Sequence, residues 1–229
     1  MSRKRALCIL AALALVPRIA FSQEIVSAEK FFSDLSAGFG KVKDYEASFT
    51  WTQGKTVSRG KISYKSPVSL RMDFDDPKDQ VLVIDGEKLT IFVPQYEVVL
   101  EQKYKKRGAG VVAAMASAQG LKTLAGSYSV AFLSEPTPVP LEEGSREQVW
   151  KLKLTPRGTT GFRQLILSTI LSTKDALIRR IEGTTTAGDR VILDLTGVRT
   201  NQSVPDSRFQ YDPPAYASVI PDFLFDPEE

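Results

Sequence analysis

The sequence predicts a mainly β protein with some α-helix (α+β), built on one large antiparallel sheet that is closed or strongly curved. Apolar residues alternate with polar residues in many short runs. Turn signals such as Asp85-Gly86 and Ala187-Gly188-Asp189 separate these runs at regular spacing. Helical periodicity is confined to two segments, near residues 27–40 and 108–126. Many short strands with regular turns are typical of closed or strongly curved sheets.

Residues 1–22 have the layout of a cleaved secretory signal. A positively charged start, Arg3-Lys4-Arg5, is followed by an apolar run at residues 6–16. In Ala20-Phe21-Ser22, the small residues Ala20 and Ser22 then occupy the two positions that a signal peptidase reads. Signal peptidases recognise this order of regions. The apolar run is shorter than the roughly 20 residues that a transmembrane helix needs. We therefore expect export, cleavage after Ser22, and a mature protein in the periplasm.

The sole cysteine, Cys8, lies inside the apolar run of the signal. An acylated lipoprotein cysteine would follow that run, so Cys8 is expected to be a small apolar residue of the signal. The mature chain then has no thiol and no disulfide, although its compartment would permit disulfides.

The mature chain, residues 23–229, is expected to form a single domain of nearly neutral charge. The full chain has 30 Lys and Arg against 27 Asp and Glu, and four of the basic residues lie in the signal. The remaining balance argues against a nucleic-acid partner, which requires a dense basic surface. Histidine is absent. That removes the commonest general base and the commonest metal ligand.

A helix is expected at the start of the mature chain. Phe31, Leu35 and Phe39 recur every four residues, the spacing of one helical face. Ser27 is a suitable N-cap because its hydroxyl can accept a hydrogen bond from a free N–H of the first turn. Gly40 favours a helix end close to that position.

The period then changes to two, which predicts a meander of antiparallel strands. Asp75-Asp76-Pro77 and Asp85-Gly86 are expected to be turns between them. The strands are expected around residues 49–51, 60–64, 70–74, 81–84, 89–93 and 98–100.

The middle of the chain interrupts the meander. Residues 108–126 are rich in Ala, Gly, Val and Met, and they can place an apolar stripe on a short helix. Residues 134–147 are expected to be an exposed loop. A second meander follows around residues 150–154, 162–171, 177–181 and 191–195, with a final strand carrying Phe209 and Tyr211. The two helices are natural covers for the sheet and would leave an apolar hollow beneath them.

Several local sequences in this order resemble the LolA family of periplasmic lipoprotein carriers. They are Ala47-Ser48-Phe49-Thr50, residues 60–67 (GKISYKSP), Asp76-Pro77, residues 80–89 (QVLVIDGEKL), Leu154-Thr155-Pro156 and residues 209–214 (FQYDPP). No single element is diagnostic, but the ordered series covers nearly all of the mature chain. The resemblance implies an incomplete, strongly curved antiparallel β-barrel, covered by a helical lid over a hydrophobic cavity that takes acyl chains.

The resemblance also implies a function, which is that of a soluble, monomeric periplasmic chaperone. It would receive acylated lipoproteins from an inner-membrane ABC-type lipoprotein-releasing transporter and deliver them to an outer-membrane acceptor. Such a carrier works by burial, so no catalytic residue, metal or cofactor is expected. Two alternatives stay open: a carrier of other lipids or glycolipids, and a lipid- or protein-sensing interaction module on the same fold.

Ten apolar residues are candidates for the wall of the implied cavity. The alternative is that they belong to a filled core, which the alternating pattern alone favours. They are Ile62, Tyr64, Leu70, Met72, Phe74, Ile91, Val111, Val112, Met115 and Leu121.

Ser66 stands where the family often has an arginine that helps to hold the lid closed. A serine makes a shorter and weaker contact than an arginine. Arg59 or Arg71 could take over that contact, and the sequence does not decide between them. Leu70 stands where the family has an aromatic residue of the inner wall.

Two charged clusters are expected to be structural. Asp73, Asp75, Asp76 and Asp79 lack the spacing of a calcium loop, and the Asp-Asp-Pro sequence is a ready turn. The basic run Lys103, Lys105, Lys106 and Arg107 is expected to be a solvated strand end, although it could also meet an acidic transporter or anionic lipid headgroups.

The signal assignment predicts that the mature protein begins at Gln23 and carries no lipid. N-terminal sequencing and intact mass of protein recovered from the periplasm check this. A mature terminus carrying an acylated cysteine would refute both the cleavage site and the interpretation of Cys8.

Overall fold

The computed structural model describes residues 27–86, 88–103, 118–172 and 176–223. In this part of the chain the predicted succession of helix, meander, helix and second meander is present. The elements are α1 (Ala28–Phe39), β1 (Asp44–Gln53), β2 (Thr56–Lys65), β3 (Ser69–Asp76), β4 (Val81–Ile84), β5 (Lys88–Val93), the 3-10 helix η1 (Pro94–Tyr96), β6 (Val98–Lys103), α3 (Ala118–Ser127), β7 (Tyr128–Phe132), β8 (Val139–Pro140), β9 (Gln148–Pro156), β10 (Phe162–Leu171), β11 (Ala176–Thr185), β12 (Arg190–Thr200), the 3-10 helix η2 (Asp206–Phe209) and β13 (Ser218–Pro221). Of these, β7, β8 and β13 are strands that the sequence pattern did not predict.

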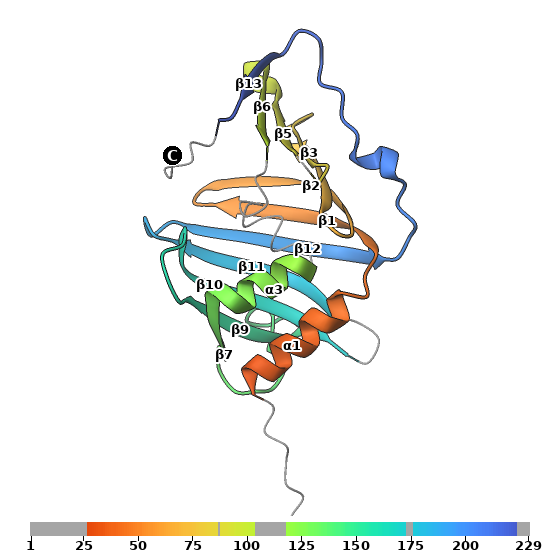
Figure 1. Ribbon diagram of the computed structural model, residues 1–229. Helices are drawn as coiled ribbons and strands as arrows, with labels where there is room; N and C mark the ends of the chain where they lie inside the picture. The colour runs from red at the N-terminus through yellow and green to blue at the C-terminus, as the bar shows by residue number, and fades with distance from the viewer. Residues whose placement is uncertain (1–26, 87, 104–117, 173–175, 224–229) are drawn as a thin grey trace, which may run out of the picture.

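The strands form one large curved sheet that does not close on itself (Figure 1). Its order is β13-β6-β5-β4-β3-β2-β1-β12-β11-β10-β9-β7, with β8 paired to β9. Neighbouring strands are antiparallel except β13 and β6, which run parallel. The expected fold class, an incomplete and strongly curved mainly β sheet with few helices, is therefore confirmed. No helix among the described residues is long and apolar enough to cross a bilayer.

Helix α1 begins and ends where its sequence predicts. The Ser27 hydroxyl accepts a hydrogen bond from the Lys30 N–H at 3.2 Å, and Gly40 is the C-cap. The apolar face of α1 packs on the inner, concave face of the sheet, where the Phe31 ring lies 4.7 Å from the Trp150 ring. Near its end α1 approaches β11 so closely that a Cβ at Gly38 would lie 2.6 Å from the Ala176 Cβ. Only a glycine fits at this contact.

The two helices cover only part of the inner face. Helix α1 packs against β7, β11 and α3, and α3 packs against β7. Figure 1 shows both helices in front of strands β7 to β12, and neither lies in front of β3 to β6. The Phe39 ring extends the covered region to β1 and β2 through contacts with Tyr45 at 6.2 Å and Tyr64 at 6.5 Å. One continuous core lies beneath the helices as a result.

The outer face of strands β2 to β6 is covered by residues 201–217, which we call the C-terminal strap. Asp73 on β3 forms ion pairs with Arg71 at 2.9 Å and with Arg208 of the strap. The Arg71 guanidinium also donates to the carbonyl of Arg208 at 3.3 Å and of Gln210 at 3.1 Å. It lies 5.6 Å from the centre of the Tyr211 ring. These contacts fasten the strap across the outside of β3.

The prediction of a final strand at Phe209 and Tyr211 is wrong. Phe209 ends η2, and Tyr211 lies in an extended segment between η2 and β13. Phe209 and Tyr211 both face the outer surface of the sheet, which explains their strand-like spacing. Phe209 is buried there, and the centre of the Tyr211 ring lies 6.5 Å from that of Phe92. The last strand comes later, at β13.

The prediction of an exposed loop at residues 134–147 is also wrong in part. This segment lies over the outer face of β9 to β11 and contributes β8, and its Leu141 is buried. Glu147 binds Arg179 at 2.9 Å and Glu142 binds Arg180 at 2.5 Å. A bulge in β11 brings these two consecutive arginines to the same surface. Glu142, one of the residues on which the loop prediction was based, is therefore the partner of an arginine whose side chain is largely buried.

Replacing Arg208 with alanine should loosen the C-terminal strap. The change removes an ion pair with Asp73 and a 3.2 Å hydrogen bond to Ser63 Oγ. Both are partly exposed, so the expected loss of unfolding free energy is about 1 kcal/mol in urea titrations. Hydrogen exchange should quicken over residues 201–217 and not elsewhere. Lys30→Ala, which breaks an exposed pair on α1, is the control and should cost less than about 0.5 kcal/mol. Faster hydrogen exchange throughout the sheet would contradict the view that Arg208 stabilises only the C-terminal strap.

Candidate functional site

The inner face of β3 to β6 carries an apolar row that the helices leave partly open. Strand register places Met72, Leu82, Ile91 and Leu100 side by side on consecutive strands, and Ile220 of β13 continues the row. We call these five residues the inner stripe. Met72 is 1% exposed, the next three are half-buried, and Ile220 is 45% exposed. Strands lie about 4.8 Å apart, so the stripe extends over roughly 19 Å.

A pocket of about 460 Å³ adjoins the buried end of the inner stripe. It lies between the β1–β2 hairpin and strands β3 and β4. Its apolar part is formed by Trp51, Met72, Phe74 and Leu82, and the Phe74 ring meets Phe49 edge-on at 5.0 Å. Four uncharged polar residues complete the lining, namely Gln53, Thr56, Ser58 and Gln80. This pocket and the inner stripe together are the candidate site.

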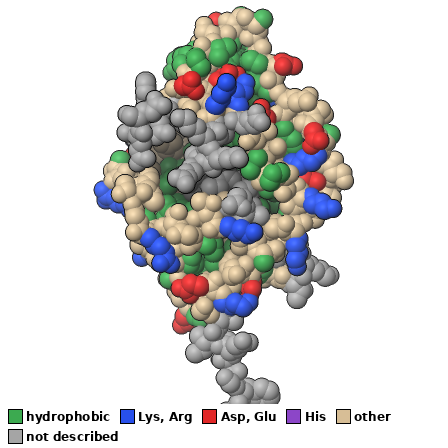
Figure 2. Space-filling model, viewed as in Figure 1, with side chains coloured by type: hydrophobic (Ala, Val, Ile, Leu, Met, Phe, Trp, Pro, Cys, Tyr) green, Lys and Arg blue, Asp and Glu red, His purple; other side chains and the backbone are tan. Residues whose placement is uncertain are grey.

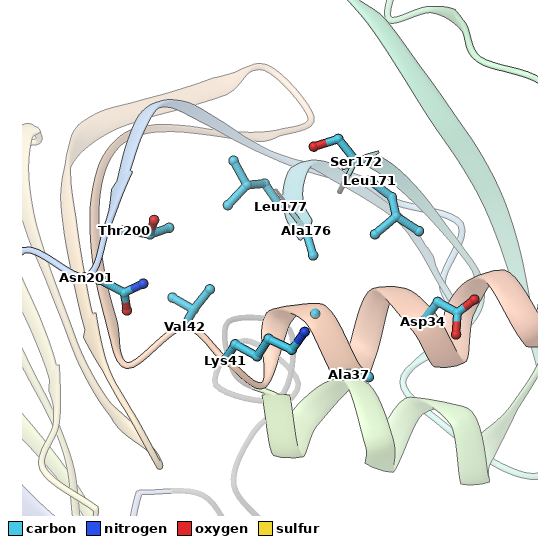
Figure 3. A pocket seen from close by; sticks show the side chains of 11 residues that line it. Asp34, Ala37, Lys41, Val42, Leu171, Ser172, Ala176, Leu177, Thr200 and Asn201 are labelled. Atoms are coloured by element: carbon cyan, nitrogen blue, oxygen red, sulfur yellow. The ribbon is translucent and has the colours of Figure 1, made fainter. Parts of the chain in front are cut away.

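A second pocket, of about 510 Å³, lies beside the C-terminal half of α1. Figure 3 shows Leu171, Ala176 and Leu177 on the strand side of this pocket, and Asp34 and Lys41 on the helix side. Asp34 is engaged by Lys30 at 2.5 Å. Although this pocket is larger, it is more polar and separate from the inner stripe. We therefore place the candidate site at the smaller pocket.

Hydrophobic side chains also reach the surface at the end of the sheet that holds β13 and β6, near the top of Figure 2. This exposed group comprises Tyr96 (70% exposed), Tyr216 (65%), Val219 (52%) and Ile220 (45%). Large exposed apolar groups of this kind often mark interaction surfaces. Ile220 joins this group to the inner stripe.

The structure divides the predicted cavity residues into three groups. Ile62, Tyr64, Leu70 and Leu121 are at most 2% exposed and form part of the filled core. Phe74 and Ile91 are half-buried at the inner face, in the pocket and the stripe respectively, whereas Met72 is 1% exposed, belongs to the same core and also lines the pocket. Val111, Val112 and Met115 lie outside the described residues.

Sequence reasoning missed Trp51, Leu82 and Leu100 as members of the open surface. A signal for Trp51 was present, since it alternates with Phe49 and so shares its face. Leu82 is hidden in an apolar run, because Val81 and Val83 are buried on the outer face while Leu82 faces inward. Periodicity cannot reveal the orientation of a strand that is apolar on both faces.

The lid-contact position, Ser66, is exposed in the turn between β2 and β3, where its N–H donates to the Lys43 carbonyl at 2.7 Å. Neither arginine considered as a substitute points toward the helices. Arg71 binds the C-terminal strap on the outer face. Arg59 lies 4.0 Å from Asp76 at the surface.

The acidic cluster is likewise structural where the contacts are defined. Asp73 is shared by two arginines, and the described residues contain no group of three potential carboxylate, thiol or imidazole ligands for a metal ion. In the basic run, Lys103 is exposed at the end of β6. Lys105, Lys106 and Arg107 lie outside the described residues.

Two hydroxyl groups are buried between α1 and the sheet without a hydrogen-bond partner in the described part of the chain, Ser36 Oγ and Tyr45 Oη. Burial raises the pKa of the Tyr45 phenol well above its ordinary value, and the neighbouring Tyr64 raises it further. Each such group costs about 1–3 kcal/mol. The contact between α1 and the sheet is therefore weaker than an entirely apolar one.

The sequence profile of the family described as "Outer membrane lipoprotein carrier protein LolA" matches residues 40–212. The chain belongs to the LolA family. Relatives in this family named "Outer-membrane lipoprotein carrier protein" come from Pseudomonas fluorescens, at 27% identity, and Pseudomonas putida, at 29% identity. Each alignment covers 161 residues, 70% of this chain and 70% or 69% of the relative.

Solved structures share the LolA-type fold at low sequence identity. An uncharacterised conserved protein from Thermus thermophilus matches with a TM-score of 0.54 and 12% identity, covering 84% of this chain and 98% of that protein. A structure described as the Pseudomonas aeruginosa MucA/MucB complex matches with a TM-score of 0.51 and 15% identity, covering 84% of this chain and 63% of that one. At these identities the similarity establishes the fold.

The filled core and the open pocket should respond differently to a charge. Leu70→Glu buries a carboxylate at a 1% exposed position, so the expected loss of unfolding free energy exceeds about 3 kcal/mol. Leu82→Glu places the same group in the half-buried pocket, where it reaches water, and the expected loss is about 1 kcal/mol. Urea unfolding of both variants measures the difference. Equal, small losses would show that the region around Leu70 is hollow.

Proposed function

We propose that the protein is a periplasmic carrier that binds the acyl chains of lipoproteins on the open inner face of its sheet. The observation that carries this proposal is the inner stripe with its adjoining pocket, an apolar surface that α1 and α3 leave partly uncovered. Membership of the LolA family supports the same role, because its named relatives are lipoprotein carriers. The candidate wall residues that we retain are Met72, Phe74 and Ile91.

The proposed mechanism is burial of apolar surface. Each methylene group removed from water contributes up to roughly 0.8 kcal/mol, so one long acyl chain contributes on the order of 10 kcal/mol before the costs of binding. That is sufficient to keep a lipoprotein in solution. Release then requires a competing acceptor or a change in the cover of the site. No step of this mechanism breaks or forms a covalent bond.

The proposed carrier acts between two membrane partners as a monomer. A signal at residues 1–22 would export it, and the mature domain, residues 23–229, would receive cargo from an ABC-type transporter of the inner membrane. It would pass the cargo to an acceptor at the outer membrane. The partly open stripe supports such transfer because an acyl chain held there stays accessible from the β13 end of the sheet.

A protein-binding role is the second candidate. It is favoured by the exposed apolar group Tyr96, Tyr216, Val219 and Ile220, and the Pseudomonas aeruginosa MucA/MucB complex contains a related fold bound to a protein. Capture of a membrane regulator by purified protein that binds no lipid would favour this role. A carrier of other lipids or glycolipids is the nearest variant of the first candidate, the lipoprotein carrier.

Phe74→Glu should abolish acyl binding and leave the protein folded. The side chain is half-buried in the pocket, so the carboxylate reaches water but occupies the space of the chain. Native mass spectrometry with a palmitoylated lipopeptide measures binding, and a thermal melt measures folding. We expect at least about a tenfold loss of affinity. Tyr96→Glu, at a 70% exposed site away from the pocket, should bind as the wild type does. Unchanged binding by Phe74→Glu would exclude this pocket as the acyl site.

A further inference from the structure

The pocket has an apolar floor and an uncharged polar rim. Met72 at its floor is 1% exposed, and Phe74 and Leu82 above it are half-buried. Gln53 and Thr56, at the end of the β1–β2 hairpin, are exposed. Polarity therefore rises from the floor to the mouth. A ligand with an apolar tail and a polar head would lie with its head at this rim.

The four rim residues have free hydrogen-bonding capacity. Within the described residues, the side chains of Gln53, Thr56, Ser58 and Gln80 have no hydrogen-bond partner. Two amides and two hydroxyls can donate to carbonyl oxygens and accept from N–H groups. Polar side chains that stabilise the fold usually form hydrogen bonds with other residues of the protein, as Ser63 does with Arg208. Those of the rim are available to a ligand.

Among the described residues, no charged side chain lines the pocket. The charged residues of the adjacent strand positions face outward, where Arg59 pairs with Asp76 and Asp73 pairs with Arg208. Lys55, in the turn between Gln53 and Thr56, is exposed and is not part of the lining. An anionic headgroup at the rim would therefore lose water without gaining a cation, which is unfavourable.

We infer that this rim recognises the uncharged carbonyl linkages of acyl chains, esters and amides, and disfavours lipids whose headgroup places an anion beside the same linkages. The inference rests on the proposed function, since it names the chemistry that the acyl pocket recognises. The amide N–H groups of Gln53 and Gln80 and the hydroxyls of Thr56 and Ser58 donate to the carbonyl oxygens of the linkage, and their oxygens accept from the N–H of an amide linkage. Anionic phospholipids are disfavoured because the described rim residues offer their phosphate no cation.

The test compares two lipopeptides that differ only at the linkage. One carries two palmitoyl esters and the other carries two hexadecyl ethers, which lack the carbonyl oxygen. Both are neutral at the linkage and equally apolar in their chains. The purified wild-type protein should bind the ester about tenfold more tightly, the effect of one or two net hydrogen bonds. Dipalmitoyl phosphatidylglycerol should fail to displace it.

The double variant Gln53→Leu/Gln80→Leu should bind both lipopeptides within about twofold of each other, by losing affinity for the ester and keeping it for the ether. Gln95→Leu, on η1 and away from the pocket, makes the same chemical change and should keep the wild-type preference. Gln80→Lys should allow the anionic lipid to compete, because it supplies the missing cation.

The outcomes distinguish a failure of the rim inference from a failure of the proposed carrier function. If wild-type protein binds ester and ether equally, or if the double variant keeps the preference, the rim does not recognise the linkage and the inference fails alone. If wild-type protein binds neither lipopeptide, the proposed carrier function fails and the inference fails with it. Thermal melts of the variants should match the wild type, since none of the exchanged side chains has a partner to lose.

Discussion

The structure depends on one mismatch: the inner face of the open sheet is larger than the two described helices can cover. A curved sheet of many strands that does not close must bury its concave side under other elements. Helix α1 provides most of this cover by packing Phe31 against Trp150 and Phe39 against Tyr45 and Tyr64. Where its cover ends, the apolar residues of β3 to β6 remain half-buried. The candidate site is the part of this face that the two described helices do not cover.

The outer face is covered by different means. The C-terminal strap crosses β2 to β6 and the 134–147 segment crosses β9 to β11, and both combine ion pairs with buried apolar side chains such as Phe209 and Leu141. Asp73 and Asp194 each receive two arginines there. Neighbouring residues of a strand reach these two different environments because side chains alternate between the faces. Arg71 and Met72, neighbours on β3, therefore serve opposite sides of the sheet.

Local features of the fold could be predicted from the sequence, and features that depend on distant segments could not. The ends of α1 follow from Ser27 and Gly40, which act within one helical turn. The alternation of Leu70, Met72 and Phe74 gave the inner face of β3 correctly. It could not show that Leu70 is buried and Phe74 half-open, because that depends on how far the cover provided by α1 reaches.

The same limit explains the errors in the second half of the chain. Phe209 and Tyr211 alternate like strand residues, but the partners of Tyr211 are Phe92 and Arg71, more than a hundred positions earlier. Glu142 and Glu147 look like solvated loop residues until the bulged arginines of β11 are in place. The rim of the pocket carries no sequence signal at all. Gln53 and Gln80 come to line the same pocket only when β1 and β4 take their places on either side of β2 and β3.

Strand β13 has a consequence for the behaviour of the protein in concentrated solution. It lies parallel to β6 and pairs with its first four residues, whose backbone groups would otherwise be free at the sheet edge and three of which are apolar. Its own outward edge is short, and Pro221 has no N–H with which to continue the ladder. Unprotected strand edges invite copies of a protein to polymerise. A sheet edge that is short and ends at a proline therefore offers other copies of the protein little backbone with which to pair.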